Sequence, residues 1–365
     1  MYKNFDRKIV FEDGREFYGY GFGATTDRVC EIVFNTSMVG YQEIVSDPSC
    51  TYQLVVMTYP LIGNYGVADE DFETKVPTIG GLVVRDYNDM PSNFRYTKTL
   101  SEVLEENGIP GIYGVDTRML TRLIRDYGSK KVFITDASTP KEDALKILGS
   151  VEIPKDAVEK VSCKKRWYSR TSNHKYNVVA IDCGITFNNI RLLNNYGCNV
   201  TVVPYNTSSE EIEFMNPDGI FISNGPGNPE DVLPVIESVK KLKGKYPIFG
   251  IGLGHLIICL AYGAKTYKMK YGHHGGNHPV RNLKNNTIEI VSQNYSYSVD
   301  EKSLDASKLT ATHTDLLDKT IEGVENIKDK VFSVQFQPGN DPGPEGSTLL
   351  FKQFIDMMKE EKDNA

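Results

Sequence analysis

Apolar and polar residues alternate in the first third of the chain, and this pattern predicts strands. Asp13 and Gly14 stand between two alternating runs in the segment KIVFEDGREFYGYGFG, which predicts a β-hairpin. The runs QLVVMTYP and IGGLVVRDY are short, apolar and rich in β-branched residues, so they predict buried strands. This part of the chain is therefore expected to form a β-rich domain.

Two helices are expected toward the end of this domain. Asp116 can cap the first helix and Gly128 can end it. One apolar stripe lies between these two residues, formed by Met119, Leu120, Leu123, Ile124 and Tyr127. The second helix is expected to begin at Thr139-Pro140, with proline at the first helical position, and to end near Gly149.

Residues 151–175 break this pattern with mixed charge and little periodicity. We therefore expect them to connect two domains, one over residues 1–150 and one over residues 176–360. The only tryptophan, Trp167, lies in this connection. Its expected role is to anchor the connection against a domain, and the alternative is a stacking contact with a ligand.

After Tyr176 the chain alternates between strands and helices. The runs NVVAID, NVTVVPY, GIFISN and YPIFGIG predict strands, and the segments between and after them predict helices, among them FNNIRLLNNYG and LGHLIICLAYG. Strict alternation with short loops implies a parallel sheet covered by helices. In such sheets ligands bind at the carboxyl ends of the strands. The expected fold class is therefore α/β.

Composition narrows the classes of function. The length of 365 residues fits two domains, and the net charge of −7 without a basic block argues against a nucleic-acid partner. The sequence has no run of 18 apolar residues and no apolar secretory signal at its start, so we expect a cytoplasmic protein without membrane contact. The cysteines lack paired short spacings and are expected to be free thiols: Cys30, Cys50, Cys163, Cys183, Cys198 and Cys259.

Two glycine-bearing junctions follow predicted strands. In ISNGPGNPED, Gly225 and Gly227 lack Cβ atoms, so a ligand can approach the backbone closely. In IFGIGLGHLIICLA, a strand runs through a tight turn into a helix, a layout similar to a nucleophile elbow. Either junction alone is more often a plain turn than a site.

Together with GAKTYKMKYGHHGGNHPV, the two junctions resemble the class I glutamine amidotransferase domain of the carbamoyl phosphate synthetase small-subunit family. The resemblance extends through IVFNTSMVGYQEIVSDPS, TYPLIGNYG, GVDTRMLTRLIRDYG and VAIDCGI, and so covers nearly the whole chain. It implies a mixed, β-rich N-terminal α/β domain followed by an amidotransferase-like domain, with a parallel sheet flanked by helices.

The resemblance also implies that the catalytic triad is replaced. The family carries its nucleophilic cysteine in GICLGHQ, and the segment here is GIGLGHL, which places Gly252 at that position. The family's FHPE is FQPG here, so Gln337 stands at the position of the base and Gly339 at that of the orienting carboxylate. Glycine offers no thiolate and glutamine does not titrate, so hydrolysis of glutamine is not expected.

A vestigial glutamine pocket is implied in the same way. Family positions that hold the substrate match Ser49, Gly225, Gly227, Leu253 and Asn294. Family residues that differ here match Leu256, Tyr295, Ser296 and Tyr297. Leu256 cannot supply the polar contacts of an amide, and Ser296 adds bulk where the family has glycine. Drift after the loss of the chemistry explains most of these changes.

Other reactive residues are given a structural interpretation. Cys183 and Cys259 are expected to pack in the core rather than to replace the nucleophile. His273, His274 and His278 suggest a metal site, but no cysteine or acidic residue stands near them in the sequence. A structural loop without a metal is therefore expected.

Three functions follow from these observations. The first is a small subunit that docks on a large synthetase subunit, which alone would use ATP and magnesium, while this chain carries no cofactor. Such a complex would use free ammonia, in arginine or in pyrimidine biosynthesis. The second is a stand-alone small-molecule-binding or regulatory pseudo-amidotransferase. The third is an enzyme of changed chemistry that uses other residues.

Overall fold

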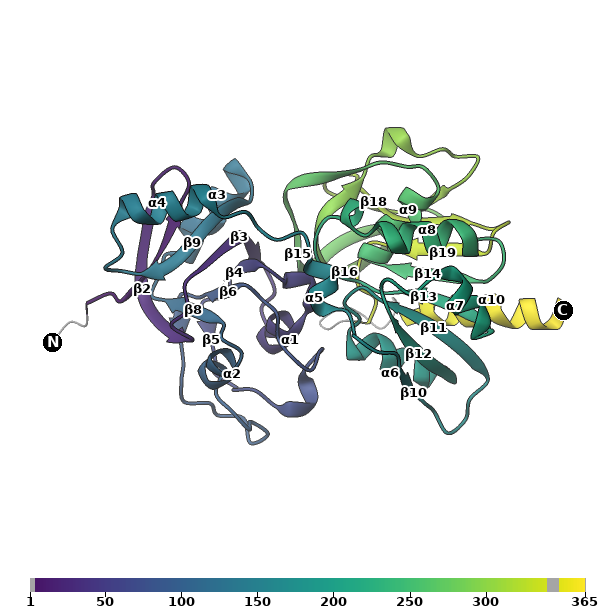
Figure 1. Cartoon of the computed structure of the whole chain (residues 1–365), viewed down its shortest axis with the longest axis horizontal. Helices are drawn as coiled ribbons and strands as arrows, with labels where there is room; N and C mark the ends of the chain where they lie inside the picture. Colours follow the sequence, from purple (N-terminus) through teal and green to yellow (C-terminus); the bar gives the residue numbers. More distant parts are fainter. Residues whose placement is uncertain (1–3, 340–347, 365) are drawn as a thin grey trace. The chain divides into compact units, whose positions relative to one another are not determined.

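The computed structural model describes residues 4–339 and 348–364 and divides into two compact units (Figure 1). The first unit comprises Met1–Pro154 with Lys270–His274, and the second comprises Lys155–Met269 with Gly275–Ala365. The α/β fold class expected from the sequence is confirmed.

The first unit is built on a closed barrel of seven strands. Around the barrel the strands are β1 (Arg7–Phe11), β2 (Glu16–Gly23), β8 (Pro110–Tyr113), β6 (Gly81–Val83), β4 (Gln53–Met57), β3 (Arg28–Asn35) and β9 (Lys130–Asp136). The other elements of this unit are α1 (Tyr41–Ser46), η1 (Pro48–Cys50), β5 (Leu61–Ile62), η2 (Asp69–Asp71), β7 (Asp86–Tyr87), α2 (Leu100–Glu106), α3 (Thr117–Tyr127) and α4 (Lys141–Ser150).

Local sequence signals in this unit work largely as expected. Strands β1 and β2 form the predicted hairpin, and Gly14 in its turn has φ +80°, a region that glycine enters at little cost. The side chain of Asp116 accepts a hydrogen bond from the Met119 N–H and so caps α3. The predicted apolar stripe is narrower than expected, because Met119 and Tyr127 are exposed. Helix α4 begins one residue later than predicted, with Pro140 as its N-cap.

The second unit contains a ten-stranded sheet. Across the sheet the strands are β10 (Trp167–Ser169), β12 (Cys198–Pro204), β11 (Tyr176–Asp182), β13 (Gly219–Ile222), β14 (Ile248–Ile251), β19 (Val331–Val334), β18 (Ile321–Asn326), β17 (Thr310–Asp315), β15 (Thr266–Asn282) and β16 (Ile288–Val299). Strands β12, β11, β13, β14 and β19 are parallel, as the alternation predicted.

Helices cover both faces of this sheet. Apolar residues on one face pack against α7 (Ser209–Phe214), α8 (Leu233–Leu242) and α9 (Leu253–Ala261). Those on the other face pack against α6 (Phe187–Asn195) and α10 (Leu349–Asn364). The remaining short elements are α5 (Ala157–Val161), η3 (Pro229–Asp231) and η4 (Glu301–Ser303). The two buried layers hold the carboxyl ends of the parallel strands in fixed positions.

Most of the segment expected to connect the domains belongs to the second unit. Within residues 151–175 the chain forms helix α5 and strand β10, and the unit begins at Lys155. Strand β10 extends the sheet by antiparallel pairing of Trp167 with Val202. Trp167 also packs against the core, so it anchors this segment to the second unit. The pairing partner lies 35 residues further along the chain (202 − 167), beyond the reach of local periodicity.

The histidine-rich segment YGHHGGNHP is a strand rather than the expected loop. Residues 266–282 form the long strand β15. Partners distant in the sequence hold its backbone: the Thr36 N–H donates to the His274 carbonyl at 3.1 Å, and Val280 pairs with Asp315 on β17. These contacts outweigh the low strand propensity of the glycines.

Candidate functional site

The turn at Gly252 connects β14 to α9 and has the geometry of an elbow. Gly252 has φ +57° and ψ −111°, a conformation that L-residues with side chains rarely adopt. Its N–H donates to the Val334 carbonyl at 2.9 Å, which ties the turn to the end of β19. The strand–turn–helix layout predicted from the sequence is therefore present, with glycine at its centre.

Neighbouring glycines allow the elbow to pack closely. A Cβ atom on Gly254 would lie 2.3 Å from the Ile222 carbonyl oxygen, a distance that no side chain tolerates. A Cβ atom on Gly252 would lie 3.3 Å from the Cβ of Asn224 and 3.8 Å from the Gln335 carbonyl oxygen. A small side chain thus nearly fits at position 252, and the backbone angle is the larger obstacle.

Gln337 follows the strand next to the elbow. Strands β14 and β19 pair in parallel, with Ile251 opposite Val334, so Gly252 and Gln337 both follow the carboxyl ends of adjacent strands. The Gln337 N–H donates to the Ser292 carbonyl at 2.9 Å, and the residue is 8% exposed. The fold therefore brings these two predicted positions to the same edge of the sheet.

Helix α6 occupies the space beside Gly339. Gly339 has φ +80°, and its carbonyl accepts a hydrogen bond from Asn188 Nδ2 at 2.5 Å. A Cβ atom at this position would lie 2.6 Å from Leu192 Cδ1. Position 339 therefore lacks a carboxylate, and a side chain there would require the Leu192 side chain to move and the residue to adopt a positive φ.

The glycine loop after β13 contacts the start of α9. A Cβ atom on Gly225 would lie 2.1 Å from the Cys183 carbonyl oxygen and 3.0 Å from Leu253 Cδ2. Gly227 has φ +86°, so this loop requires glycine at both positions. Leu253 and Leu256 are buried in the apolar core beside it. Their side chains offer no hydrogen bond to an amide.

The remaining predicted pocket residues lie on two different units. Asn294, Ser296 and Tyr297 lie on β16 in the second unit, where Tyr297 packs against the apolar core. Ser49 lies on η1 in the first unit and is buried; its N–H donates to Asp47 Oδ1 at 2.8 Å. The assignment of these residues to a glutamine pocket stays a prediction.

Four of the cysteines have thiols whose pKa is raised by burial, the opposite of what a nucleophile requires: Cys163, Cys183, Cys198 and Cys259. Cys183 and Cys259 are fully buried, as expected, and burial raises the pKa of both thiols well above the ordinary value. Cys163 is half-buried, and burial together with the Asp182 carboxylate raises its pKa to about 12. All six are free cysteines, as the sequence predicted.

Cys259 has a histidine neighbour that the sequence analysis missed. Its Sγ lies 3.9 Å from Nε2 of His255, one turn earlier on α9. Burial, and to a smaller extent the nearby His313, lowers the pKa of His255 to about 3. This pair is neutral and enclosed, because His255 and Cys259 are both 0% exposed. It gives no support to an enzyme of changed chemistry.

Glu322 on β18 is a second polar feature that the sequence analysis missed. It is fully buried, and its carboxylate accepts hydrogen bonds from Tyr295 Oη at 2.5 Å and from Gln293 Nε2 at 3.1 Å. Burial raises the pKa of Glu322 well above 4.5. An acidic residue within the buried run of IEGVEN is the signal that could have drawn attention to it.

The histidine-rich strand has an acidic neighbour from another strand. Within the second unit, a ring nitrogen of His278 and a carboxylate oxygen of Asp315 lie within 4.8 Å of each other. An acidic residue therefore lies close to this segment in space although none stands near it in the sequence. The metal-free interpretation of the segment stays a prediction.

No helix within residues 4–339 and 348–364 has the length and apolar character needed to cross a membrane.

Comparison with known proteins gives relatives over nearly the full length. The family model of the carbamoyl-phosphate synthase small chain, CPSase domain, matches residues 9–134, and that of glutamine amidotransferase class-I matches residues 179–357. The chain is 48% identical to the carbamoyl phosphate synthase small chain of Staphylococcus saprophyticus, over 98% of this chain and 97% of that protein. It is 46% identical to the one from Fusobacterium nucleatum, over 96% and 98%.

Among solved structures, a protein from Thermoplasma acidophilum that is described as a GMP synthase subunit is 22% identical. The similarity covers 52% of this chain and 97% of that protein, with a TM-score of 0.46.

Proposed function

The chain belongs to the carbamoyl phosphate synthase small chain family, and we propose that it is a pseudo-glutaminase within that family. In this proposal it docks on a large synthetase subunit but does not hydrolyse glutamine. The observation that carries the proposal is the elbow at Gly252, which keeps its strand–turn–helix geometry around a residue without a side chain. No thiolate can form there to attack an amide carbonyl.

Two further positions support the same proposal. Gln337, at the predicted position of the base, cannot accept and return a proton at neutral pH. Gly339, at the predicted position of the orienting carboxylate, has no side chain that could orient a base, and its φ of +80° is one that favours glycine. Cys183 and Cys259 offer no substitute, since burial keeps their thiols protonated.

The large subunit would then depend on free ammonia as its nitrogen source. ATP and magnesium would bind to that subunit rather than to this chain. The supply of arginine and the supply of pyrimidines fit this proposal equally well, and the cytoplasmic location expected from the sequence remains a prediction. A stand-alone regulatory protein is the alternative outcome of the test below.

Co-expression with the large subunit from the same genome tests the proposal. The two chains should elute together in size-exclusion chromatography at micromolar concentration, since permanent complexes bury more than about 2,000 Å². The complex should release no glutamate from glutamine above the uncatalysed rate. Separate elution would favour the stand-alone regulatory protein, and steady release of glutamate by the purified complex would refute the pseudo-glutaminase.

A further inference from the structure

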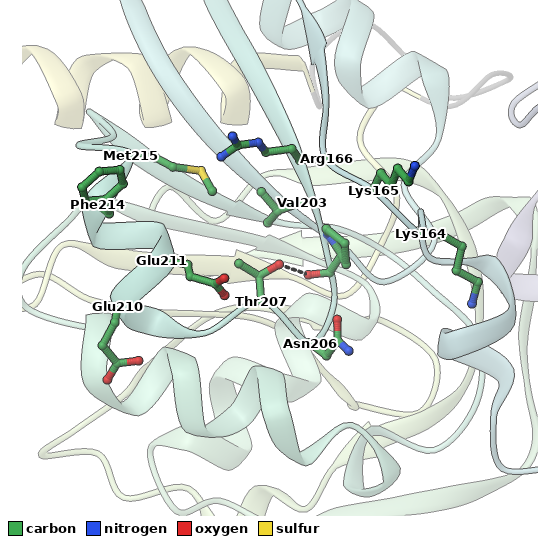
Figure 2. Close-up of a pocket in the computed structure, with 11 residues that line it drawn as sticks. Lys164, Lys165, Arg166, Val203, Asn206, Thr207, Glu210, Glu211, Phe214 and Met215 are labelled. Carbon is green, nitrogen blue, oxygen red and sulfur yellow. Dashed lines mark hydrogen bonds between the residues drawn. The ribbon is translucent and has the colours of Figure 1, made fainter.

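A pocket of about 720 Å³ lies in the second unit, beside the end of β12 and helix α7 (Figure 2). Val203 and Pro204 at the carboxyl end of β12 contribute to its wall. In open parallel sheets, ligands bind in crevices at the carboxyl ends of the strands. The volume falls within the range of small-molecule sites, about 300–1,000 Å³. The proposed loss of glutamine chemistry makes no use of this pocket.

The charges around the pocket leave an excess of positive charge. Lys165 and Arg166 line it and are exposed, and neither forms an ion pair within residues 4–339 and 348–364. The two acidic residues of the lining already have partners. Glu210 accepts a hydrogen bond from Lys241 Nζ at 3.0 Å, and Glu211 accepts bonds from the N–H and Oγ of Ser208, which cap helix α7.

An aromatic ring stands at another side of the pocket. Phe214, at the end of α7, is 90% exposed, an unusual position for so large an apolar side chain. Met215 follows it in the lining, and Figure 2 shows Phe214 and Met215 together, with Arg166 extending toward their side of the pocket. Asn206 and Thr207 add an amide and a hydroxyl group. The lining thus combines cations, a ring and neutral polar groups.

We propose that this pocket binds a nucleoside phosphate. Arg166 would hold the phosphate, because its guanidinium group forms paired, charge-assisted hydrogen bonds with phosphate oxygens. The base would stack on Phe214, since every nucleobase presents a flat face to an aromatic ring. The Thr207 hydroxyl donates to the Pro204 carbonyl at 2.8 Å, so toward a sugar hydroxyl group it would act as an acceptor. A simple carboxylate would leave the ring without a partner.

Calorimetric titration of the full-length chain with the four ribonucleoside monophosphates tests this proposal. At least one should bind, and ribose 5-phosphate and inorganic phosphate should bind more weakly because neither can stack. Phe214→Ala should weaken the nucleotide about tenfold by removing the stacking contact. Arg166→Gln should weaken it about tenfold by removing a charge-assisted contact. Both side chains are exposed, so neither change should affect folding.

Two matched variants control for unspecific effects of charge and apolar surface. Lys359→Gln removes an exposed cation of the second unit outside the pocket, and Ile327→Ala removes an apolar side chain that is 82% exposed. Neither variant should change the affinity of the chain for the nucleotide. Absence of binding by all four nucleotides would overturn the proposal. Equal affinity for inorganic phosphate and nucleotide, or unchanged binding by Phe214→Ala and Arg166→Gln, would overturn it as well.

Discussion

Gly252 and Gly339 have backbone angles that oppose any side chain. Their φ values are +57° and +80°, both in the left-handed region that favours glycine. At position 252 the surroundings leave nearly enough space for a Cβ atom, whereas at position 339 the Leu192 side chain would have to move. A side chain at either position therefore meets backbone strain, and at position 339 it also crowds Leu192.

Gly252→Cys should lower the stability of the second unit without restoring glutamine hydrolysis. A side chain in this conformation costs about 1–3 kcal/mol, and a thiol without a base stays mostly protonated, with a pKa near 8.5. Urea unfolding followed by the fluorescence of Trp167, the only tryptophan, measures the stability of this unit. Gly252→Ala is the matched control and should lose about as much stability. Glutamine turnover typical of the family from Gly252→Cys alone would show that the base has been misassigned.

The triple variant Gly252→Cys, Gln337→His, Gly339→Glu should also remain weakly active. Gly339→Glu should destabilise the second unit by about 1–3 kcal/mol, because the new side chain overpacks against Leu192. Adding Leu192→Ala should recover part of that loss by making room. Unfolding midpoints of the variants with and without Leu192→Ala check this. If Leu192→Ala is equally destabilising in both backgrounds, the clash is not the cause.

Local patterns predicted individual elements better than their pairing. The hairpin at Asp13-Gly14, the cap at Asp116 and the elbow at Gly252 depend on residues close in sequence, and all three are present. The closure of the first-unit barrel, strand β10 and strand β15 depend on partners far along the chain, and the sequence analysis missed them. Periodicity carries no information about such long-range pairing, which is decided by packing between strands.

The same limit applies to polar groups that connect strands. Gln293 and Tyr295 on β16 donate to Glu322 on β18, although two strands separate β16 from β18 in the sheet. Because burial raises the pKa of this carboxyl group, the stability of the strands that it joins depends on pH. The contact between Leu192 and Gly339 was missed for the same reason, because Leu192 lies on a helix about 150 residues before Gly339 in the sequence.

The contribution of Glu322 to the stability of the second unit should fall as the pH rises above about 4.5. Buried His255 and His313, whose pKa values are lowered to about 3 and about 4, contribute in the opposite direction up to about pH 6.5, so the Glu322 contribution is read as the difference between parent and variant. The pKa of Glu322 is raised in the folded state, so the folded chain binds a proton that the unfolded chain has already released in this range. Glu322→Gln should flatten the dependence, because glutamine does not titrate. The buried Oε1 of Gln293 has no partner and can accept from the new amide, so the variant should be tolerated. Urea midpoints at several pH values measure the slope.

Glu325→Gln is the matched control on the same strand. Its carboxylate pairs with Lys284 near the surface, so its removal should leave the pH dependence of the parent protein in place. An equal flattening by both substitutions would assign the effect to charge in general rather than to Glu322.

At the scale of the whole molecule, a pseudo-glutaminase would keep the ability to dock on a large subunit after losing the ability to produce ammonia. Long family segments are present in both units, and the relatives match 96–98% of the chain. In the proposal, the reaction is lost through changes at Gly252, Gln337 and Gly339, and the first two of these follow the carboxyl ends of adjacent strands. A chain of this kind can keep its partner while it loses its own reaction.

Carbamoyl phosphate synthesis by the complex should therefore depend on ammonium salts and not on glutamine. Neutral ammonia is the reactive species, since the ammonium ion has no lone pair, so the ammonium requirement should fall as pH rises until groups of the enzyme titrate. Assays with each nitrogen donor across pH measure this. Synthesis from glutamine at the rate seen with ammonia would contradict the proposal.

Thermal melts with millimolar glutamine distinguish a pocket that no longer binds glutamine from one that binds it without hydrolysis. A ligand that binds only the folded state raises the melting temperature. Because the proposal holds that glutamine no longer binds, glutamine should not shift the melting temperature. A clear shift without turnover would mean that the pocket still binds glutamine, and a sensor would then be the better description.

The angle at Gly252 has a consequence for the history of such a chain. In any ancestor with a side chain at this position, replacement by glycine would have released about 1–3 kcal/mol of backbone strain. The loss of the reaction would then have made the protein more stable, so selection for folding alone would favour it. Restoring the reaction would require changes at three positions, and a side chain at position 252 would bring back the strain without any activity to offset it. Under this proposal, glycine at the elbow is gained more easily than it is lost.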